Sequence, residues 1–177
     1  MRNNQVRKLI FTALCITLGL ILPQFNRFIP IPNAGAVLLP MHIPVLLAGF
    51  LCGLPYAALC GLILPLLSFA ITGMPPIYPI GLSMMLELAA YGAITAILYK
   101  LTKGKVFVSL IGGMLGGRIV MGIANAILLG MAGNTYGVKA FVTAAFVTAL
   151  PGIIIQIIII PIIVVALRKA KLVETIA

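Results

Sequence analysis

Long apolar runs dominate the chain, and short polar or proline-rich segments separate them. A hydrocarbon core about 30 Å thick is crossed by about 20 helical residues, so runs of this length predict membrane spans. We expect spans at residues 6–22, 41–53, 55–72, 79–100, 106–132 and 138–167. The last range is long for one crossing, so we expect it to bend near Pro151 or Pro161. The pattern predicts an all-α integral membrane protein, with residues 1–177 forming one domain of six transmembrane helices.

Two connecting segments differ from the others. Residues 24–40 are rich in proline, asparagine and glycine, and we expect them to form a long loop. Residues 73–79 contain Pro75, Pro76 and Pro79, which predict a stiff, extended connection. Long loops in compact proteins are often functional lids, so both segments are candidates for covering a site.

The composition excludes a soluble domain, because the chain is 63% hydrophobic and only 8% charged. The net charge of +10 does not indicate nucleic acid, because the basic residues form short clusters beside apolar runs. Six spans place both termini on one side, and that side collects most of the basic residues: Arg2, Arg7, Lys8, Lys100, Lys103, Lys105, Arg168, Lys169 and Lys171. Arg27 and Lys139 fall on the other side. Since lysine and arginine favour cytoplasmic loops, we expect cytoplasmic termini.

One permanent cation, Arg118, lies inside the apolar range 106–132. A charge at membrane depth is costly and by default marks a functional site. Glu87 is the acidic residue of the range 79–100, about 12 Å below the outer surface at 1.5 Å per helical residue. The same arithmetic places Arg118 about 18 Å above the inner surface. In a core about 30 Å thick these depths nearly coincide, so the two charges are expected to share one cavity.

Residues on the same helix faces complete a candidate substrate-binding site. Three-, four- and seven-residue steps share a helix face, and on this basis the predicted site contains Glu87, Arg118, Met84, Tyr91, Met121 and Asn125. His42, at the outer end of 41–53, either bonds loop backbone or contacts the ligand. A mostly apolar cavity with a few polar anchors suits a small organic molecule. The alternative is a purely structural ion pair between Glu87 and Arg118.

Four glycines precede Arg118 as two G-x-x-x-G pairs, Gly112/Gly116 and Gly113/Gly117. Small residues four apart let helices approach closely, either within one subunit or in a dimer. They are not a phosphate-binding loop, because no strand precedes them and no Gly-Lys-Ser/Thr follows. There is one histidine and no acidic cluster, so we expect no metal site and no cofactor. The absence of a nucleophile–histidine–acid set argues against an enzyme.

Three stretches resemble the substrate-binding S components of energy-coupling factor (ECF) vitamin transporters: residues 40–50 (PMHIPVLLAGF), residues 73–76 (GMPP) and residues 87–92 (ELAAYG). The resemblance implies high-affinity capture of a vitamin-like molecule from outside a bacterial cytoplasmic membrane, in a pocket on spans four to six that the two outer loops close. It implies docking on a membrane coupling subunit that carries two ATPase subunits. Docking in the family uses an Ala-x-x-x-Ala patch on the first span, where this chain has Ala13 and Thr17.

The cargo and the function class remain open at this point. A carboxylate such as pantothenate would fit Arg118, since the planar guanidinium binds carboxylates through two parallel hydrogen bonds. A cationic base, such as a queuosine precursor, would instead fit Glu87. The competing function is a small homo-oligomeric membrane channel with the glycine face at its subunit interface. An intramembrane enzyme is a third and weaker hypothesis.

Overall fold

The structure is a computed structural model that describes residues 2–170, apart from the side chains of Arg2, Asn3 and Arg27. Lys171, expected on the side of the termini, lies outside the described residues. The described elements are α-helices joined by short 3-10 and π segments, in the following order: α1 (Arg2–Ile21), a 3-10 segment (Leu22–Phe28), α2 (Ala34–Leu38), α3 (His42–Leu51), α4 (Leu54–Thr72), a π segment (Ile77–Gly81), α5 (Leu82–Leu101), α6 (Val106–Met131), α7 (Val138–Val142), a π segment (Thr143–Thr148) and α8 (Leu150–Lys169).

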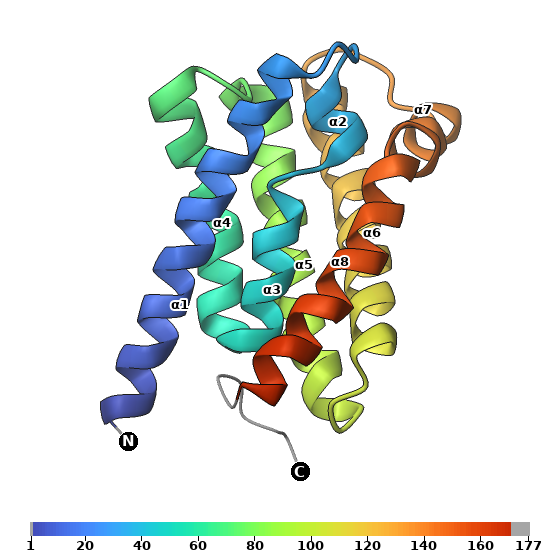
Figure 1. Cartoon of the computed structure of the whole chain (residues 1–177). Helices are drawn as coiled ribbons and strands as arrows, with labels where there is room; N and C mark the ends of the chain where they lie inside the picture. Colours follow the sequence, from blue (N-terminus) through green and yellow to red (C-terminus); the bar gives the residue numbers. More distant parts are fainter. Residues whose placement is uncertain (1, 171–177) are drawn as a thin grey trace.

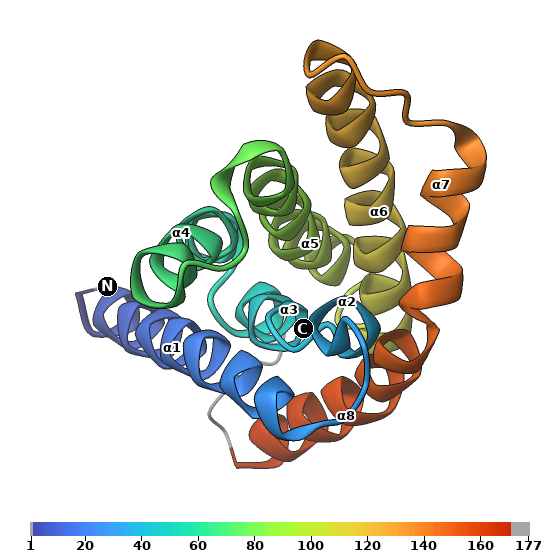
Figure 2. The same ribbon diagram turned by 90° about the horizontal axis from the view of Figure 1, so that it is seen from above.

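Six segments of the described chain are long and apolar enough to cross a membrane, as expected. Their arrangement is a ring around one helix. Seen along the bundle, α3 lies in the middle with α1, α4, α5, α6 and α8 around it (Figure 2). Nearly all of α3 is buried, whereas α1 exposes many of its apolar side chains. A short helix that is apolar apart from His42 is therefore the core, and the outer faces of its neighbours are suited to lipid.

One expectation about the connections is wrong in part. Residues 24–40 are not an irregular loop, because they contain α2, which packs against α8. The range 138–167 bends near Pro151, one of the two expected positions. The chain forms α7 at the edge of the bundle, outside α6 and near one end, and turns at Ala149 into α8 (Figures 1 and 2). Pro151 explains the break, because its ring excludes the carbonyl of Val147 from a regular helical hydrogen bond.

Glycines hold α5 close to three neighbouring helices. A methyl group added at Gly61 of α4 would overlap the α5 backbone at Leu88 and Ala89. One added at Gly49 of α3 would press against Thr95 of α5. The four glycines of α6 that precede Arg118 face the same helix, since added methyl groups would meet Leu98, Thr95, Ile94 and Tyr91 in turn. The G-x-x-x-G pairs therefore pack α6 on α5 inside the subunit.

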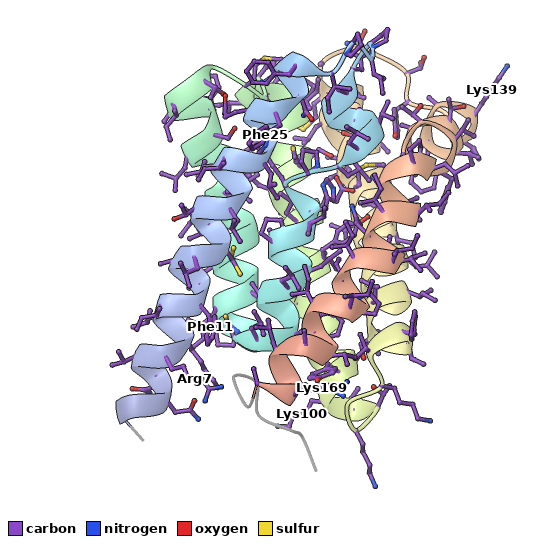
Figure 3. All side chains as sticks on the ribbon, in the orientation of Figure 1. Arg7, Phe11, Phe25, Lys100, Lys139 and Lys169 are labelled. Atoms are coloured by element: carbon purple, nitrogen blue, oxygen red, sulfur yellow. The ribbon has the colours of Figure 1, made fainter. Side chains whose placement is uncertain are left out.

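The charged side chains mark the two ends of the bundle differently. Arg7, Lys100 and Lys169 lie at the end where α1 begins and α8 ends, which we call the terminal end, and Lys139 lies at the opposite end (Figure 3). At the terminal end Arg168 donates hydrogen bonds to the hydroxyl of Tyr99 and to the carbonyl of Gly104. These bonds join the last turn of α8 to the end of α5 and to the turn between α5 and α6.

Candidate functional site

A stripe of buried polar side chains runs along α5, consisting of Ser83, Glu87, Tyr91, Thr95 and Tyr99. These residues are four apart, a spacing that keeps neighbouring members on adjoining parts of one helix face. The face points into the bundle, where water is excluded. Each polar atom on the stripe therefore needs a partner from another helix or from a ligand.

Arg118 and Glu87 meet at the middle of this stripe. Arg118 Nη1 donates to Glu87 Oε1 at 2.8 Å, and both residues are only 4% exposed. The expected approach of the two charges is thus confirmed. Nη1 also lies 3.6 Å from the sulfur of Met121, one turn further along α6. A buried pair of this kind is stable only while both partners remain, because either charge alone would be buried without compensation.

His42 and Tyr91 enclose the pair. His42 Nε2 lies 3.4 Å from the same Glu87 oxygen that accepts the arginine hydrogen bond. The Tyr91 ring packs edge-on against the His42 ring at 5.0 Å and lies 5.9 Å from the guanidinium carbon of Arg118. Three helices, α3, α5 and α6, therefore contribute one contiguous cluster, which we call the polar cluster: His42, Glu87, Tyr91, Arg118 and Met121.

Several atoms of the polar cluster have no hydrogen-bond partner within the described chain. They are Nε and Nη2 of Arg118, both ring nitrogens of His42 and the hydroxyl of Tyr91. Most buried polar groups in proteins are paired, so a concentration of unpaired ones in a single place calls for an explanation. A site that completes its hydrogen bonds with a ligand is such an explanation.

The remaining expected site residues lie further from the charges. Asn125 is one turn beyond Met121 on α6, and its amide is 3.5 Å from the hydroxyl of Tyr136 in the α6–α7 connection. Met84 is half-buried and packs against the hydrophobic core. The structure therefore brings five of the seven expected residues into one cluster and places Asn125 and Met84 beside it.

Gln156 of α8 was not among the expected site residues. It is completely buried, and its Nε2 donates to the carbonyl of Leu39 at 3.4 Å. The backbone N–H of His42 donates to the same carbonyl at 3.1 Å. Gln156 therefore sits at the start of α3, next to the polar cluster. The sequence signal was a lone amide in an apolar run, and that signal does not identify a partner.

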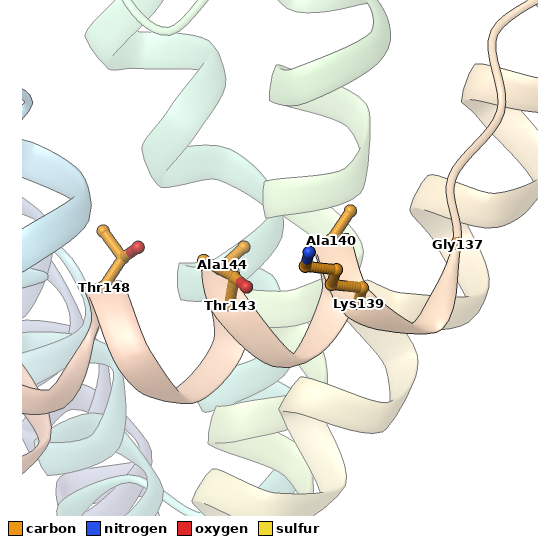
Figure 4. A pocket seen from close by; sticks show the side chains of 6 residues that line it. All are labelled: Gly137, Lys139, Ala140, Thr143, Ala144 and Thr148. Atoms are coloured by element: carbon orange, nitrogen blue, oxygen red, sulfur yellow. The ribbon is translucent and has the colours of Figure 1, made fainter.

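A surface hollow lies elsewhere, on α7 and the segment that follows it. Gly137, Lys139, Ala140, Thr143, Ala144 and Thr148 line it (Figure 4). Its lining shares no residue with the polar cluster, and small or exposed side chains form most of it. Within residues 2–170, no three His, Cys, Asp or Glu side chains gather closely enough to ligate a metal ion.

The two residues of the expected docking patch, Ala13 and Thr17, lie on an exposed face of α1. The Thr17 hydroxyl donates to the carbonyl of Ala13 at 2.9 Å, so its polar atom is satisfied within the helix. The face also exposes Leu14 and Leu18. It is a lipid-compatible surface of small and aliphatic side chains.

A comparison with protein families matches residues 7–164 to the family described as "ECF transporter, substrate-specific component". Comparisons with curated proteins and with solved structures gave no significant match. The matched range includes the whole polar cluster and confirms the resemblance seen in the sequence. The molecule is accordingly a multi-pass, all-helical membrane protein and the substrate-binding part of a transporter that works with partner modules. The chain belongs to the family of substrate-specific components of ECF transporters.

Proposed function

We propose that this chain captures a small carboxylate-bearing molecule, of which pantothenate is an example, and that the carboxylate binds Arg118. The observation that carries this proposal is which guanidinium nitrogens of Arg118 have hydrogen-bond partners. Glu87 accepts a hydrogen bond from Nη1, whereas Nε and Nη2 are buried and unpartnered among the described residues.

Nε and Nη2 form one edge of the planar guanidinium, and their N–H bonds point in parallel. This edge matches the two oxygens of a carboxylate, which accepts such bonds in pairs. Glu87 holds the opposite side of the guanidinium, because its hydrogen bond with Nη1 fixes the orientation of the guanidinium plane. The ion pair and the ligand site are therefore one arrangement, and the pair does not have to open for the ligand to bind.

The same contacts disfavour a cationic cargo. Glu87 Oε1 already accepts from Arg118 and lies 3.4 Å from His42 Nε2. A ligand cation would compete for this oxygen and would bring positive charge next to Arg118. Donors without partners outnumber acceptors in the polar cluster, which favours a ligand rich in acceptors.

We further propose that both termini are cytoplasmic, in a bacterial cell membrane. The clustering of basic side chains at the terminal end supports this orientation. The α2 and Ile77–Gly81 segments then face outside, at the end from which the cargo would enter. The exposed face of α1 that carries Ala13 and Thr17 would dock on a coupling subunit that works with two ATPase subunits.

The first experiment is native mass spectrometry of the purified chain, which should detect a bound carboxylate. Isothermal titration should then show tighter binding of pantothenate than of pantothenol, its alcohol counterpart. Arg118→Lys keeps the positive charge but removes the two parallel N–H donors of the guanidinium. Loss of about 1.5–3 kcal/mol of charge-assisted hydrogen bonding predicts roughly 10- to 150-fold weaker binding.

Arg7→Lys is the matched control, because it makes the same change at the terminal end of α1, and it should bind like the parent. Equal binding of pantothenate by Arg118→Lys and the parent, or a preference for the alcohol, would refute the assignment. The channel hypothesis loses its main support, because the glycines that suggested a subunit interface pack against α5 within one chain.

A further inference from the structure

Gln156 offers a second anchor for the cargo, on a different helix from Arg118. Its side chain is 0% exposed in the apolar interior of α8, yet half of its amide has no partner within residues 2–170. Such a group is rare, because a buried acceptor without a donor is strongly disfavoured.

The orientation of the amide follows from its one hydrogen bond. The partner is the carbonyl of Leu39, which can only accept, so the group that faces it must be the NH₂. The atom left without a partner is therefore the oxygen, Oε1. This assignment does not depend on distinguishing nitrogen from oxygen by their positions alone.

The backbone at Leu39 fixes the place of this oxygen. Leu39 adopts a left-handed conformation with φ of 52°, and it connects α2 to the first turn of α3. Its carbonyl accepts from both His42 N–H and Gln156 Nε2. On the neighbouring turn of α8, Gly152 lets the helix approach the carbonyls of Val37 and Leu38. The amide thus lies at the start of α3, whose first residue, His42, belongs to the polar cluster.

We propose that Gln156 Oε1 is a specificity-determining acceptor that binds a hydroxyl or N–H donor of the cargo. This inference rests on the proposed function, in which Arg118 holds the carboxylate of the same molecule. The two anchors together define the substrate class as a carboxylate with a hydrogen-bond donor elsewhere on its frame. A carboxylate without a donor leaves Oε1 buried and unpaired, and the site discriminates against it.

The experiment uses the full chain in lipid nanodiscs and an equimolar panel of ligands. Pantothenate and biotin carry a carboxylate and N–H donors, whereas nicotinate and lipoate carry a carboxylate without such donors. Native mass spectrometry of the parent should retain a donor-bearing member in preference to both donor-free members. Derivatives of the retained ligand are then prepared, each methylated at one of its N–H or hydroxyl donors. For each derivative, we take the ratio of its dissociation constant to that of the unmodified ligand, and the largest ratio identifies the donor that the site binds.

The parent should bind the methylated derivative at least tenfold more weakly. Gln156→Met keeps the length of the side chain but removes the acceptor, so this ratio should fall to about one. A purely structural role for Gln156 would weaken both ligands equally and leave the ratio unchanged. Ser109→Ala, which removes a buried hydroxyl bonded to Lys105 and Thr102 at the terminal end, is the control and should keep the parental ratio.

The outcomes separate the two proposals. In one outcome, Arg118→Lys retains less ligand than the parent, and Gln156→Met keeps the parental ratio of dissociation constants. This outcome overturns the inference about Gln156 and leaves the proposed function standing. If the parent retains nicotinate or lipoate as well as it retains a donor-bearing ligand, the inference about Gln156 is overturned and the proposed function is not. Failure of the parent to retain any member of the panel overturns the carboxylate proposal and, with it, the role of Gln156.

Discussion

Gly117→Ala tests whether the close contact between α5 and α6 sets the geometry of the site. The added methyl group would overlap the ring of Tyr91. That ring cannot move aside easily, because it is fully buried between His42 and Arg118. Either α6 moves away from α5 or Tyr91 leaves its position in the polar cluster.

Overpacking of this kind costs about 1–3 kcal/mol. Alanine is also the better helix former, and that gain would mask part of the loss, so a control on the same helix is required. Gly130→Ala supplies it, because an added methyl group there meets no other atom within 4 Å. The difference between the two variants isolates the contact with Tyr91. At 2–4 °C per kcal/mol for a chain of this size, Gly117→Ala should melt roughly 2–12 °C below Gly130→Ala.

The chain contains no tryptophan, so unfolding is best followed through its thiols. Cys15, Cys52 and Cys60 are all buried and free, and a fluorogenic thiol reagent reacts with them as the bundle opens. Binding of the retained cargo is measured on the same samples and should weaken in Gly117→Ala alone. Equal melting temperatures and equal affinities for the two alanine variants would show that the contact with Tyr91 does not position the site.

Three other predictions follow from the contacts. Glu87→Met leaves Arg118 buried without its partner and should destabilise the chain by about 3–5 kcal/mol, whereas Glu87→Met combined with Arg118→Met should recover most of the loss in the thiol assay. Tyr99→Phe removes the hydroxyl that accepts a hydrogen bond from Arg168 of α8. The loss of about 1.5–3 kcal/mol should lower the melting temperature. An unchanged melting temperature would show that this hydrogen bond contributes nothing to stability. In cells, a membrane-impermeant thiol reagent should label Lys139→Cys and not Lys103→Cys; the reverse pattern would invert the topology.

The depth of the two charges was predictable because it depends on few quantities. A helix rises 1.5 Å per residue, and the ends of the two spans follow from hydropathy, so Glu87 and Arg118 had to lie at similar levels. Their contact at 2.8 Å agrees with that estimate. Packing of the glycines inside one subunit was one of two alternatives, and their contacts with α5 favour it.

Features that depend on contacts between distant segments were not predictable. The helix α2 has five residues, too few to give a periodic signal, and it is stabilised by packing on α8. The partner of Gln156 is a backbone carbonyl 117 residues away, and no local pattern encodes it. The sequence predicted a bend near Pro151 or Pro161 but did not distinguish the two prolines. The chain bends before Pro151, whereas Pro161 lies inside a continuous α8.

The glycine contacts around α5 separate the framework of the bundle from its chemistry. Gly49 of α3 and Gly61 of α4 hold their helices close to α5, because a methyl group added at either would meet the α5 backbone, and neither glycine belongs to the polar cluster. Side chains of the polar cluster can therefore be exchanged while the distances from α5 to α3 and α4 are preserved. Related chains could diverge in cargo through a few substitutions and still present the same outer faces to their partners.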